Sequence, residues 1–271
     1  MSKLNPVILS IENKHERDQY ITFDEGPHIY TVHGEQGYTS VTTFVHQKFS
    51  HFDPDKVIDG FVKKGKLNDP TYKYYGMTRE QIKQQWHENG QLASGSGTKM
   101  HFDIECYYNE LQPNNDSIEY SYFKNFVKDY PNLKAYRTEW MVYDEESKIS
   151  GSIDMVFETP DGTCQIYDWK RVNEIKYEDN WGNKKGKVDT LKHLPDTNFW
   201  RYSLQLNIYR YILEKNYGKK ITGMYLVCLH PENPCKNYER IEVHDLRKEV
   251  EELFKVRKME LTTEMDETSE K

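Results

Sequence analysis

The sequence predicts a mixed α/β fold in which helices flank a central sheet. Its centre is the stretch 151–170, where two short runs rich in β-branched and aromatic residues, 152–157 and 164–169, are joined by a Thr-Pro-Asp-Gly turn typical of an antiparallel hairpin. A strand-like run at 136–143 precedes this hairpin, and an amphipathic helix at 198–216 follows it. With 271 residues and 36% hydrophobic content, the chain can bury one large core.

The N-terminal part is predicted to be less regular. Residues 1–20 are polar and predict an irregular arm, whereas residues 28–33 alternate like a strand. Residues 38–45 lead into a short helix for which Ser40 is the expected N-cap.

Helices dominate the next part of the sequence. Residues 53–66 open with Asp-Pro and residues 78–90 open with a Thr-x-x-Gln capping box, so each run predicts a helix. A longer helix is expected at 93–109, starting in a run of small residues, and another is expected at 117–130.

After the hairpin the sequence predicts a loop, a strand and the closing elements. Residues 171–197 are polar and predict a long loop, and residues 222–229 are apolar enough for the buried strand that a crossover helix leads into. A further strand is expected at 238–243 and a last helix at 246–259. The expected parts are an N-terminal arm with a helical extension at 1–92, a core at 93–260 and an acidic tail at 261–271.

The composition disfavours several classes of protein. A net charge of −7 argues against non-specific coating of nucleic acid. The four cysteines contain no CxxC pair, so their spacing predicts neither a zinc nor an iron–sulfur site and favours the reduced thiols of an intracellular protein. Because the N-terminus has no apolar signal core and no run approaches about 18 apolar residues, we expect neither secretion nor membrane insertion.

The central hairpin carries charged residues where a core strand should be apolar. Asp154 lies inside the first run and Asp168 near the end of the second, with Lys170 on the same face as Asp168. Adjacent carboxylates repel unless a cation lies between them, and an all-oxygen site suits Mg²⁺ or Mn²⁺. Lys170 would then position a water or stabilise charge on a phosphate. The alternative is a solvated hairpin with a charged outer face.

Two predicted helices carry polar pairs spaced by one turn. His101 and Glu105 share one helix face, as do Gln205 and Tyr209 on the helix at 198–216. A histidine beside a glutamate on a helix surface is common without any function, so this pair alone defines no site.

The loop at 171–197 is basic within an acidic chain. The stretch 170–192 contains seven basic and four acidic residues, a local charge of +3. Such a loop can contact a phosphate backbone, although a merely solvated loop is an equal alternative. Candidates for stacking on unpaired bases are Trp181, Phe199 and Trp200, of which the last two could instead belong to the core.

Together these residues resemble the PD-(D/E)XK nuclease superfamily, in particular its RecB-like and lambda-exonuclease-like branch. The match covers residues 95–229, and although each motif alone is weak, four occur in the family's order on the expected elements. They are Gly-Thr-x-x-His ending at His101, Ile-Asp ending at Asp154, Asp-Trp-Lys at 168–170 and Gln-x-x-x-Tyr at 205–209. The resemblance implies a restriction-endonuclease-like core.

The resemblance also implies a metal site. Asp154, Asp168 and the main-chain carbonyl of Trp169 would ligate the catalytic metal ion, Mg²⁺ or Mn²⁺, with His101 completing or flanking the site. Lys170 would orient the attacking water and stabilise charge on the phosphate.

Other residues receive supporting roles from the same resemblance. Gln205 and Tyr209 would support Lys170 and the DNA strand, and Glu105 and Glu139 would support the metal ligands from outside the coordination sphere. The candidate DNA contacts are Arg171, Trp181, Lys184, Lys185, Trp200 and Arg201.

The chain departs from the family pattern at two points. Ile153 stands where the family name has Pro, a common variation in the RecB-like branch. The cysteines do not reproduce the arrangement of the cluster-bearing relatives, because Cys106 and Cys164 fall inside the core and only Cys228 and Cys235 follow it. We therefore expect no iron–sulfur cluster.

The expected function is that of a metal-dependent DNA nuclease, more specifically an exonuclease in DNA replication, recombination or repair. Its partner would be DNA with a free end, including single-stranded DNA. The alternatives are a non-catalytic nucleic-acid-binding module on the same fold, a restriction-type endonuclease, and a metal-dependent enzyme for another phosphate ester. The presence of Asp154, Asp168 and Lys170 together argues against the pure binding module.

Overall fold

The computed structural model describes residues 4–178 and 184–269 of the chain. These residues divide into two compact units. The core unit comprises Met1–Ser50 and His101–Lys271, and the helical unit comprises His51–Met100. The expected boundary at residue 92 stays a prediction.

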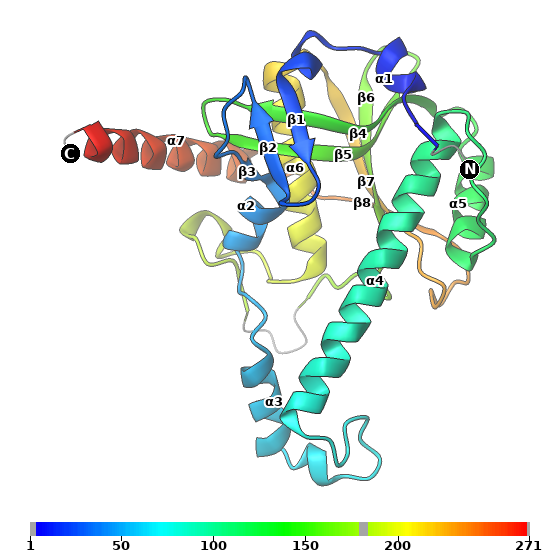
Figure 1. The fold of residues 1–271 in the computed structure, drawn as a ribbon, viewed down its shortest axis with the longest axis vertical. Helices are drawn as coiled ribbons and strands as arrows, with labels where there is room; N and C mark the ends of the chain where they lie inside the picture. The colour runs from blue at the N-terminus through cyan, green and yellow to red at the C-terminus, as the bar shows by residue number, and fades with distance from the viewer. Residues whose placement is uncertain (1–3, 179–183, 270–271) are drawn as a thin grey trace. The chain divides into compact units, whose positions relative to one another are not determined.

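Among the described residues, a mixed six-stranded sheet forms the centre of the core unit (Figure 1). Its strands are β3 (Thr39–Ser40), β4 (Lys134–Asp144), β5 (Ile149–Glu158), β6 (Cys164–Lys170), β7 (Ile221–Cys228) and β8 (Glu239–Glu242). β5 pairs antiparallel with β4 and β6, β6 pairs parallel with β7, β7 pairs antiparallel with β8, and the short β3 joins the start of β5 in parallel. The structure thus confirms the predicted mixed α/β fold, with a central mixed sheet flanked by helices.

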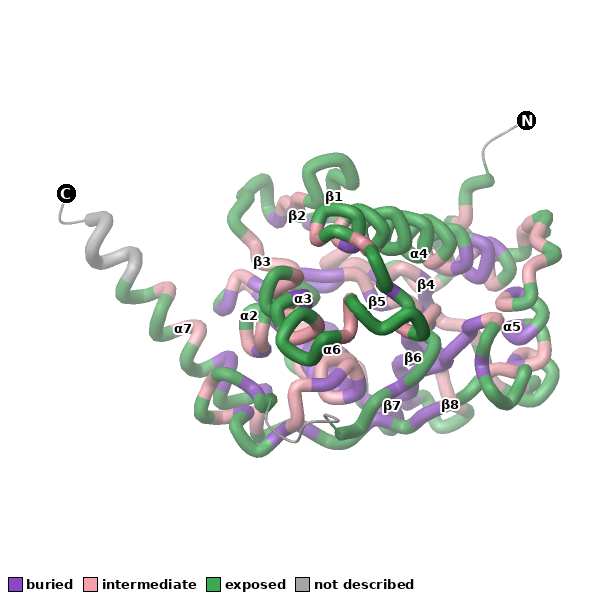
Figure 2. The backbone as a smooth tube through the Cα atoms, turned by 90° about the horizontal axis from the view of Figure 1, so that it is seen from below, coloured by how far each residue is buried: buried purple, intermediate pink, exposed green. Residues whose placement is uncertain are grey.

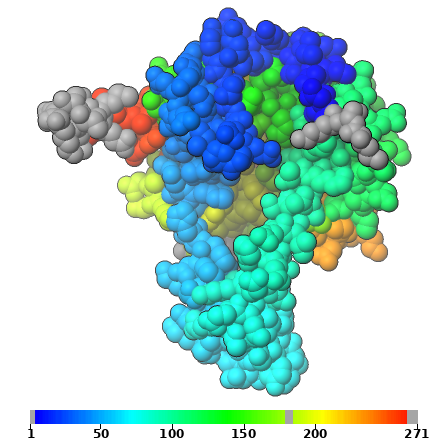
Figure 3. All heavy atoms as spheres, viewed as in Figure 1, coloured from blue at the N-terminus to red at the C-terminus, as the bar shows by residue number. Residues whose placement is uncertain are grey.

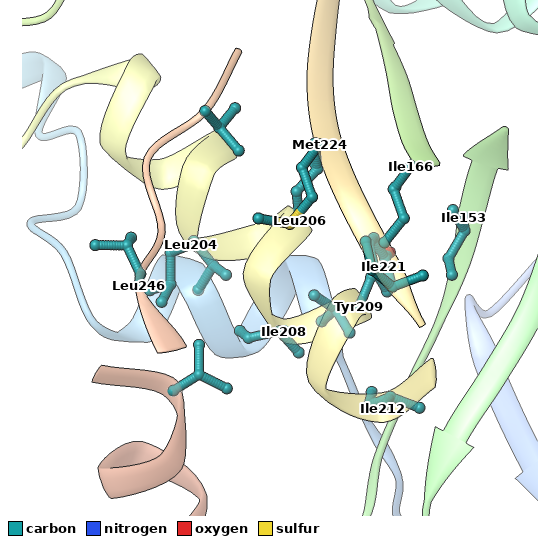
Figure 4. Packing of buried hydrophobic residues seen from close by; sticks show 14 of the residues in the cluster. Ile153, Ile166, Leu204, Leu206, Ile208, Tyr209, Ile212, Ile221, Met224 and Leu246 are labelled. Atoms are coloured by element: carbon teal, nitrogen blue, oxygen red, sulfur yellow. The ribbon is translucent and has the colours of Figure 1, made fainter. Parts of the chain in front are cut away.

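One face of the sheet is covered by α6 (Asn198–Asn216), the crossover helix between β6 and the parallel strand β7. Figure 4 shows side chains of α6, among them Leu206 and Ile208, in one buried apolar cluster with Ile166 of β6 and Met224 of β7. Burying one such large apolar side chain contributes about 1.5–3 kcal/mol, so this interface is a main source of stability. The predicted helix and the buried strand that follows it are both confirmed.

Aromatic side chains cover the other face of the sheet. Trp169 of β6 packs against Phe123 and Phe126 of α5 (Ile118–Asp129), with ring centroids 5.7 Å and 5.4 Å apart. Figure 2 shows that β6 and β7 are buried along most of their length. Because side chains alternate along a strand, Trp169 on this face leaves Asp168 and Lys170 for the opposite face.

Residues 4–20 do not form the irregular arm that the sequence predicts. They contain α1 (Ile8–Glu12), which contacts β4, and a 3₁₀ turn at Glu16–Tyr20. Figure 3 shows these N-terminal residues, in blue, on the surface of the core unit. Asp18 accepts hydrogen bonds from Arg137 at 2.7 Å and from the Trp140 indole N–H at 3.0 Å. These partners are 119 and 122 residues away in sequence, so no local pattern could reveal this order.

Two local predictions in the next segment are confirmed. Ser40 caps α2 (Val41–Gln47), because its Oγ accepts the Thr43 N–H at 3.1 Å. The strand expected at 28–33 is β2 (Ile29–Val32). It pairs with β1 (Ile21–Asp24), a strand that the sequence analysis did not predict.

The helical unit contains α3 (Pro54–Lys63) and the first turns of α4 (Arg79–Tyr108). The predicted capping box is present, since Thr78 Oγ1 accepts the Gln81 N–H at 3.2 Å and Gln81 Oε1 accepts the Thr78 N–H at 2.8 Å. The predicted break between two helices near residue 91 is wrong, because α4 is one helix of 30 residues that continues through Gly90. A glycine costs a helix interior about 1 kcal/mol, which is too little to end a helix of this length.

The last helix, α7 (Arg247–Ser269), also extends beyond its predicted end near Met259. The residues that follow Met259 include Leu, Glu and Met, which are good helix formers, so the acidic tail begins within the helix. Neither α7 nor any other described helix has the length and apolar content needed to cross a membrane.

Candidate metal centre

The central strands bring the two hairpin aspartates next to each other. Met155 of β5 pairs with Tyr167 of β6 in antiparallel register. Asp154 and Asp168 therefore occupy the next pair of facing positions on these two neighbouring strands. Asp168 is buried, and its Oδ2 lies 2.6 Å from Lys170 Nζ. Asp168 and Lys170 therefore form an ion pair on one face of β6.

His101 connects this hairpin to helix α4. Its Nε2 lies 2.8 Å from the main-chain carbonyl oxygen of Trp169. Its Nδ1 lies 3.5 Å from Asp154 Oδ2 and 3.7 Å from Glu139 Oε1. The same Asp154 oxygen accepts the Trp169 N–H at 2.9 Å. The four residues thus form one connected polar cluster.

Glu139 occupies a strained position in the middle of β4. Its φ of 42° lies in the left-handed region, which non-glycine residues rarely adopt and which costs about 1–3 kcal/mol. The flanking residues Thr138 and Trp140 keep their pairing with β5. The carboxylate is held by the Ser152 hydroxyl, which donates to Glu139 Oε2 at 2.8 Å. Such strain persists where the surrounding structure enforces it, and it concentrates at functional sites.

The donor atoms of this cluster fit a divalent metal ion. His101, Glu139 and Asp154 each offer one ligand atom, and these three atoms lie within 4.8 Å of one another. Imidazole and carboxylate groups are common ligands of first-row divalent metals, and carboxylates also suit Mg²⁺. Glu139, which the sequence analysis placed outside the coordination sphere, thus lies among the candidate ligands.

The electrostatics of the cluster also favour a cation. Burial raises the pKa of the Asp154 carboxyl, and the neighbouring Asp168 raises it further. Burial alone would lower the pKa of His101, but Asp154 and Glu139 raise it to about 9. A positive charge on the imidazole therefore offsets the two partly buried carboxylates, and a bound cation would supply the same compensation.

Lys170 is held as a cation. Burial would lower the pKa of its ammonium group, but Asp168 and Asp154 raise it above the ordinary lysine value. The ammonium also lies over the ring of Tyr202, with Nζ 4.5 Å from the ring centroid. Tyr202 was missed in the sequence analysis. The available signal was its position on α6, one turn before Gln205 on the same helix face.

A cavity of about 790 Å³ opens beside Lys170 in the core unit. Basic and polar side chains dominate its lining. The lining residues are Thr42, Val45, His46, Lys170, Lys176, Glu178, Lys184, Asp196, Thr197, Asn198, Arg201, Tyr202 and Gln205. Four lysine and arginine residues face two acids, so the cavity favours an anionic ligand.

The Gln-x-x-x-Tyr pair on α6 is divided between cavity and core. Gln205 lines the cavity beside Lys170. Tyr209 is buried, and a Cβ placed on Gly151 would lie 2.8 Å from the Tyr209 hydroxyl oxygen. Only glycine at 151 leaves room for this ring, so Tyr209 fixes the approach of α6 to β5. Glu105 lines a smaller cavity of about 190 Å³ together with Glu139. Burial is the larger cause and the charge of Glu139 the second cause that raise the pKa of Glu105 to about 7.

The arginines predicted to contact DNA make ion pairs within the core unit. Arg171 Nε lies 2.6 Å from Glu119 Oε1. Arg201 contacts Asp196 at 2.5 Å and donates to the Ser50 carbonyl oxygen.

The remaining predicted contacts differ in exposure. Lys184 lines the large cavity and Lys185 is exposed. The Trp200 indole N–H donates to the Tyr177 carbonyl oxygen at 3.0 Å, and Phe199 belongs to the core. Trp181 lies outside the described residues.

No protein-family model and no curated protein matches this chain. Among solved structures, a protein named SSO0001 is 14% identical, with 84% of this chain and 77% of the other covered and a TM-score of 0.33. A protein from Eubacterium rectale named "Putative exonuclease" is 11% identical, with 83% and 79% covered and a TM-score of 0.37.

Proposed function

We propose that the chain is a metal-dependent DNA nuclease that hydrolyses phosphodiester bonds, and that it acts as an exonuclease. The observation that carries the proposal is the position of Lys170. Its ammonium is 2.6 Å from Asp168, borders the basic cavity and lies on the strand adjacent to Asp154. A cation between an acidic metal centre and a basic cavity can stabilise the negative charge that develops on a phosphate during hydrolysis of a phosphodiester.

The donor set supports a metal held by Asp154, Glu139 and His101, with the Trp169 carbonyl oxygen nearby. When bound, a divalent cation supplies Lewis-acid activation of water and neutralises negative charge on the phosphate. Asp168 holds Lys170 in place, and Tyr202 supports the ammonium from the side of α6. In the reaction a water oxygen bonds to phosphorus and gives up one proton, the bond from phosphorus to the leaving oxygen breaks, and the leaving oxygen takes up one proton, so the proton count is unchanged.

Lys170 acts in this reaction as a fixed positive charge and not as a base. The raised pKa of its ammonium keeps it protonated at neutral pH. A charged donor beside the phosphate stabilises the negative charge that develops on the oxygens in the transition state. Asn198 and Gln205, which line the same cavity, add amide groups that can hydrogen-bond to phosphate or sugar oxygens.

The cavity supports a strand end as substrate. Its volume of about 790 Å³ falls within the range of small-ligand pockets, about 300–1,000 Å³. A pocket of this size suits a terminal segment of one strand better than the long duplex site of a sequence-specific cutter. This is the basis for proposing exonuclease action on DNA with a free end.

We also propose the branch of the PD-(D/E)XK superfamily to which the chain belongs and the cellular process in which it acts. The order of the four motifs along the chain supports a restriction-endonuclease-like core of the RecB-like or lambda-exonuclease-like type. Enzymes of this chemistry with a preference for DNA ends fit DNA replication, recombination or repair.

Cleavage of end-labelled DNA tests the function. Linear and circular, single- and double-stranded DNA are incubated with Mg²⁺, Mn²⁺ or EDTA, using wild type, Lys170→Ala and Lys128→Ala. Lys128 is an exposed lysine on α5, so its variant controls for loss of one surface charge. We expect metal-dependent loss of linear DNA, reduced about 10²–10³-fold in Lys170→Ala and unchanged in Lys128→Ala.

Two outcomes would replace the proposal. Cleavage of circular DNA as fast as linear DNA would indicate an endonuclease. DNA binding without cleavage under every metal condition, with wild type and Lys170→Ala alike, would indicate a binding module on this fold.

A further inference from the structure

The helical unit carries a concentrated positive charge at one loop. Residues 63–76, here called the basic loop, contain Lys63, Lys64, Lys66 and Lys73 against the single acid Asp69, a local charge of +3 in a chain of −7. None of these residues belongs to the motifs or the cavity described above. The basic loop is therefore a group of residues distinct from those assigned to the proposed active site.

The ion pairs of the helical unit lie on other residues. Asp55 contacts Lys83 at 2.5 Å, and Asp59 contacts Arg79 at 2.5 Å. In the described part of the chain, Lys63, Lys66 and Lys73 make no ion pair with a carboxylate. Lys63 and Lys73 are exposed, and Lys66 is half-buried. Their positive charge is available to an external anion.

Aromatic rings lie beside these lysines. Lys66 Nζ is 5.0 Å from the centroid of the Tyr72 ring, and Lys73 Nζ is 4.8 Å from that of Tyr74. The two tyrosine rings are 5.8 Å apart, centroid to centroid. The next residue, Tyr75, is 52% exposed. Charge and exposed ring surface thus occur together, as in proteins that bind single-stranded nucleic acid.

The loop is held in shape before any ligand binds. Gly65 and Gly76 adopt φ values of 65° and 69°, which favour glycine, and the Gly76 N–H donates to the Leu67 carbonyl oxygen at 3.1 Å. The Tyr74 hydroxyl oxygen accepts the Trp86 indole N–H at 2.6 Å, which fixes the loop to α4. A preformed loop loses little conformational freedom on binding, so the lysines can contribute to affinity.

We infer that the basic loop is a second nucleic-acid contact, which binds the phosphate backbone of a single strand through Lys63, Lys66 and Lys73 while Tyr75 stacks on a base. The inference rests on the proposed function for the identity of the partner as nucleic acid, and it does not depend on the metal or on cleavage. An acidic protein surface would use the charges but not the exposed tyrosine, so the ring favours a nucleic acid.

Binding to a labelled single-stranded oligonucleotide in EDTA tests the inference. Anisotropy titrations are made at salt concentrations from about 50 to 200 mM with the full chain, the triple variant Lys63→Ala/Lys66→Ala/Lys73→Ala and the control Lys56→Ala/Lys83→Ala. Each phosphate contact contributes about 0.7 to the salt slope for single strands, so the triple variant should lose about 2 from the slope. The control lysines are engaged with Asp53 and Asp55, and the slope should not change.

A second pair of variants separates charge and stacking from loss of structure. Replacing the three lysines by arginine keeps the charges and should bind like wild type. Tyr75→Ser should weaken binding of single-stranded DNA more than that of double-stranded DNA. An unchanged salt slope in the alanine variant would overturn the inference, and so would a loss of binding in the arginine variant.

The outcome is distinguishable from failure of the nuclease proposal. Because binding is measured in EDTA, the triple alanine variant can show a smaller salt slope than wild type even if neither protein cleaves DNA. Conversely, if the protein is an active nuclease but the triple alanine variant keeps the wild-type salt slope, the proposed function stands and the inference about the basic loop is wrong.

Discussion

His101 Nε2 lies 2.8 Å from the carbonyl oxygen of Trp169, while Nδ1 of the same ring lies 3.5 Å from Asp154 Oδ2. One imidazole therefore joins the end of β6 to the carboxylate of β5. A carbonyl oxygen can only accept, so Nε2 donates to Trp169, and Nδ1 is the ring nitrogen that faces Asp154 and Glu139 and can bind a metal ion once it has lost its proton.

We predict that His101→Ala weakens binding of Mn²⁺ by at least about 10-fold, because it removes one of the three candidate ligand atoms. Isothermal titration calorimetry without DNA measures this directly. The control is His193→Ala, which removes an exposed histidine 3.2 Å from Glu249. Equal Mn²⁺ affinity in wild type and His101→Ala would remove His101 from the ligand set.

Tyr202 is predicted to position the Lys170 ammonium through its ring. The cation–π contact is worth about 0.5–2 kcal/mol, so Tyr202→Leu should lower kcat on linear DNA about two- to thirty-fold with KM little changed. Tyr202→Phe keeps the ring and should retain most of the activity. Equal losses in the Phe and Leu variants would assign the effect to the hydroxyl group instead.

Gly151→Ala is predicted to destabilise the fold. The added Cβ would lie 2.8 Å from the Tyr209 hydroxyl oxygen and 3.1 Å from Val41 Cγ2, both in a packed core. Overpacking of this kind costs about 1–3 kcal/mol, so the free energy of unfolding in urea should fall by that amount. The matched control is Gly95→Ala in α4, where nothing lies within 4 Å of the new Cβ. That control should be neutral or stabilising, and a loss as large as that of Gly151→Ala would contradict the packing argument.

Asp245 gives a pH-dependent prediction. A hydrogen bond from Arg210 lowers the pKa of the Asp245 carboxyl from 3.8 to about 2. The contribution of this ion pair to the free energy of unfolding is therefore fully present above pH 3.8 and is lost as the pH falls through 2. Because the Asp245 side chain is 63% exposed, Asp245→Asn should lower the free energy of unfolding by less than about 1 kcal/mol at pH 7.

Urea unfolding at neutral pH and near pH 2 checks this prediction. The difference between wild type and Asp245→Asn should shrink at the acidic end, where the wild-type carboxyl is protonated too. Glu251→Gln, at an exposed acid on α7, is the control and should show no such trend. A difference that stays constant with pH would indicate that packing, not charge, explains the effect.

Much of the fold was predictable because helix caps, turns and the alternation of apolar residues depend on residues close together in the sequence. Ser40 and Thr78 cap helices as their sequences predict, and the hairpin turn after Glu158 joins two strands in antiparallel register. The cooperative length of α4 was not predictable, because the cost of each glycine is small beside the hydrogen bonds of a 30-residue helix. The order of residues 4–20 was equally hidden, because it depends on Asp18 meeting Arg137.

The sequence by itself determined the strand and helix types, the caps, and the presence of acids and a lysine within a hairpin that should otherwise be apolar. Only the tertiary structure decided which of these groups meet. It brought Glu139 into the cluster with His101, set Tyr202 over Lys170 and placed Tyr209 against Gly151. The physical reason is that caps and alternation act over a few residues, whereas side chains from different strands and helices meet only after register, twist and helix packing are set.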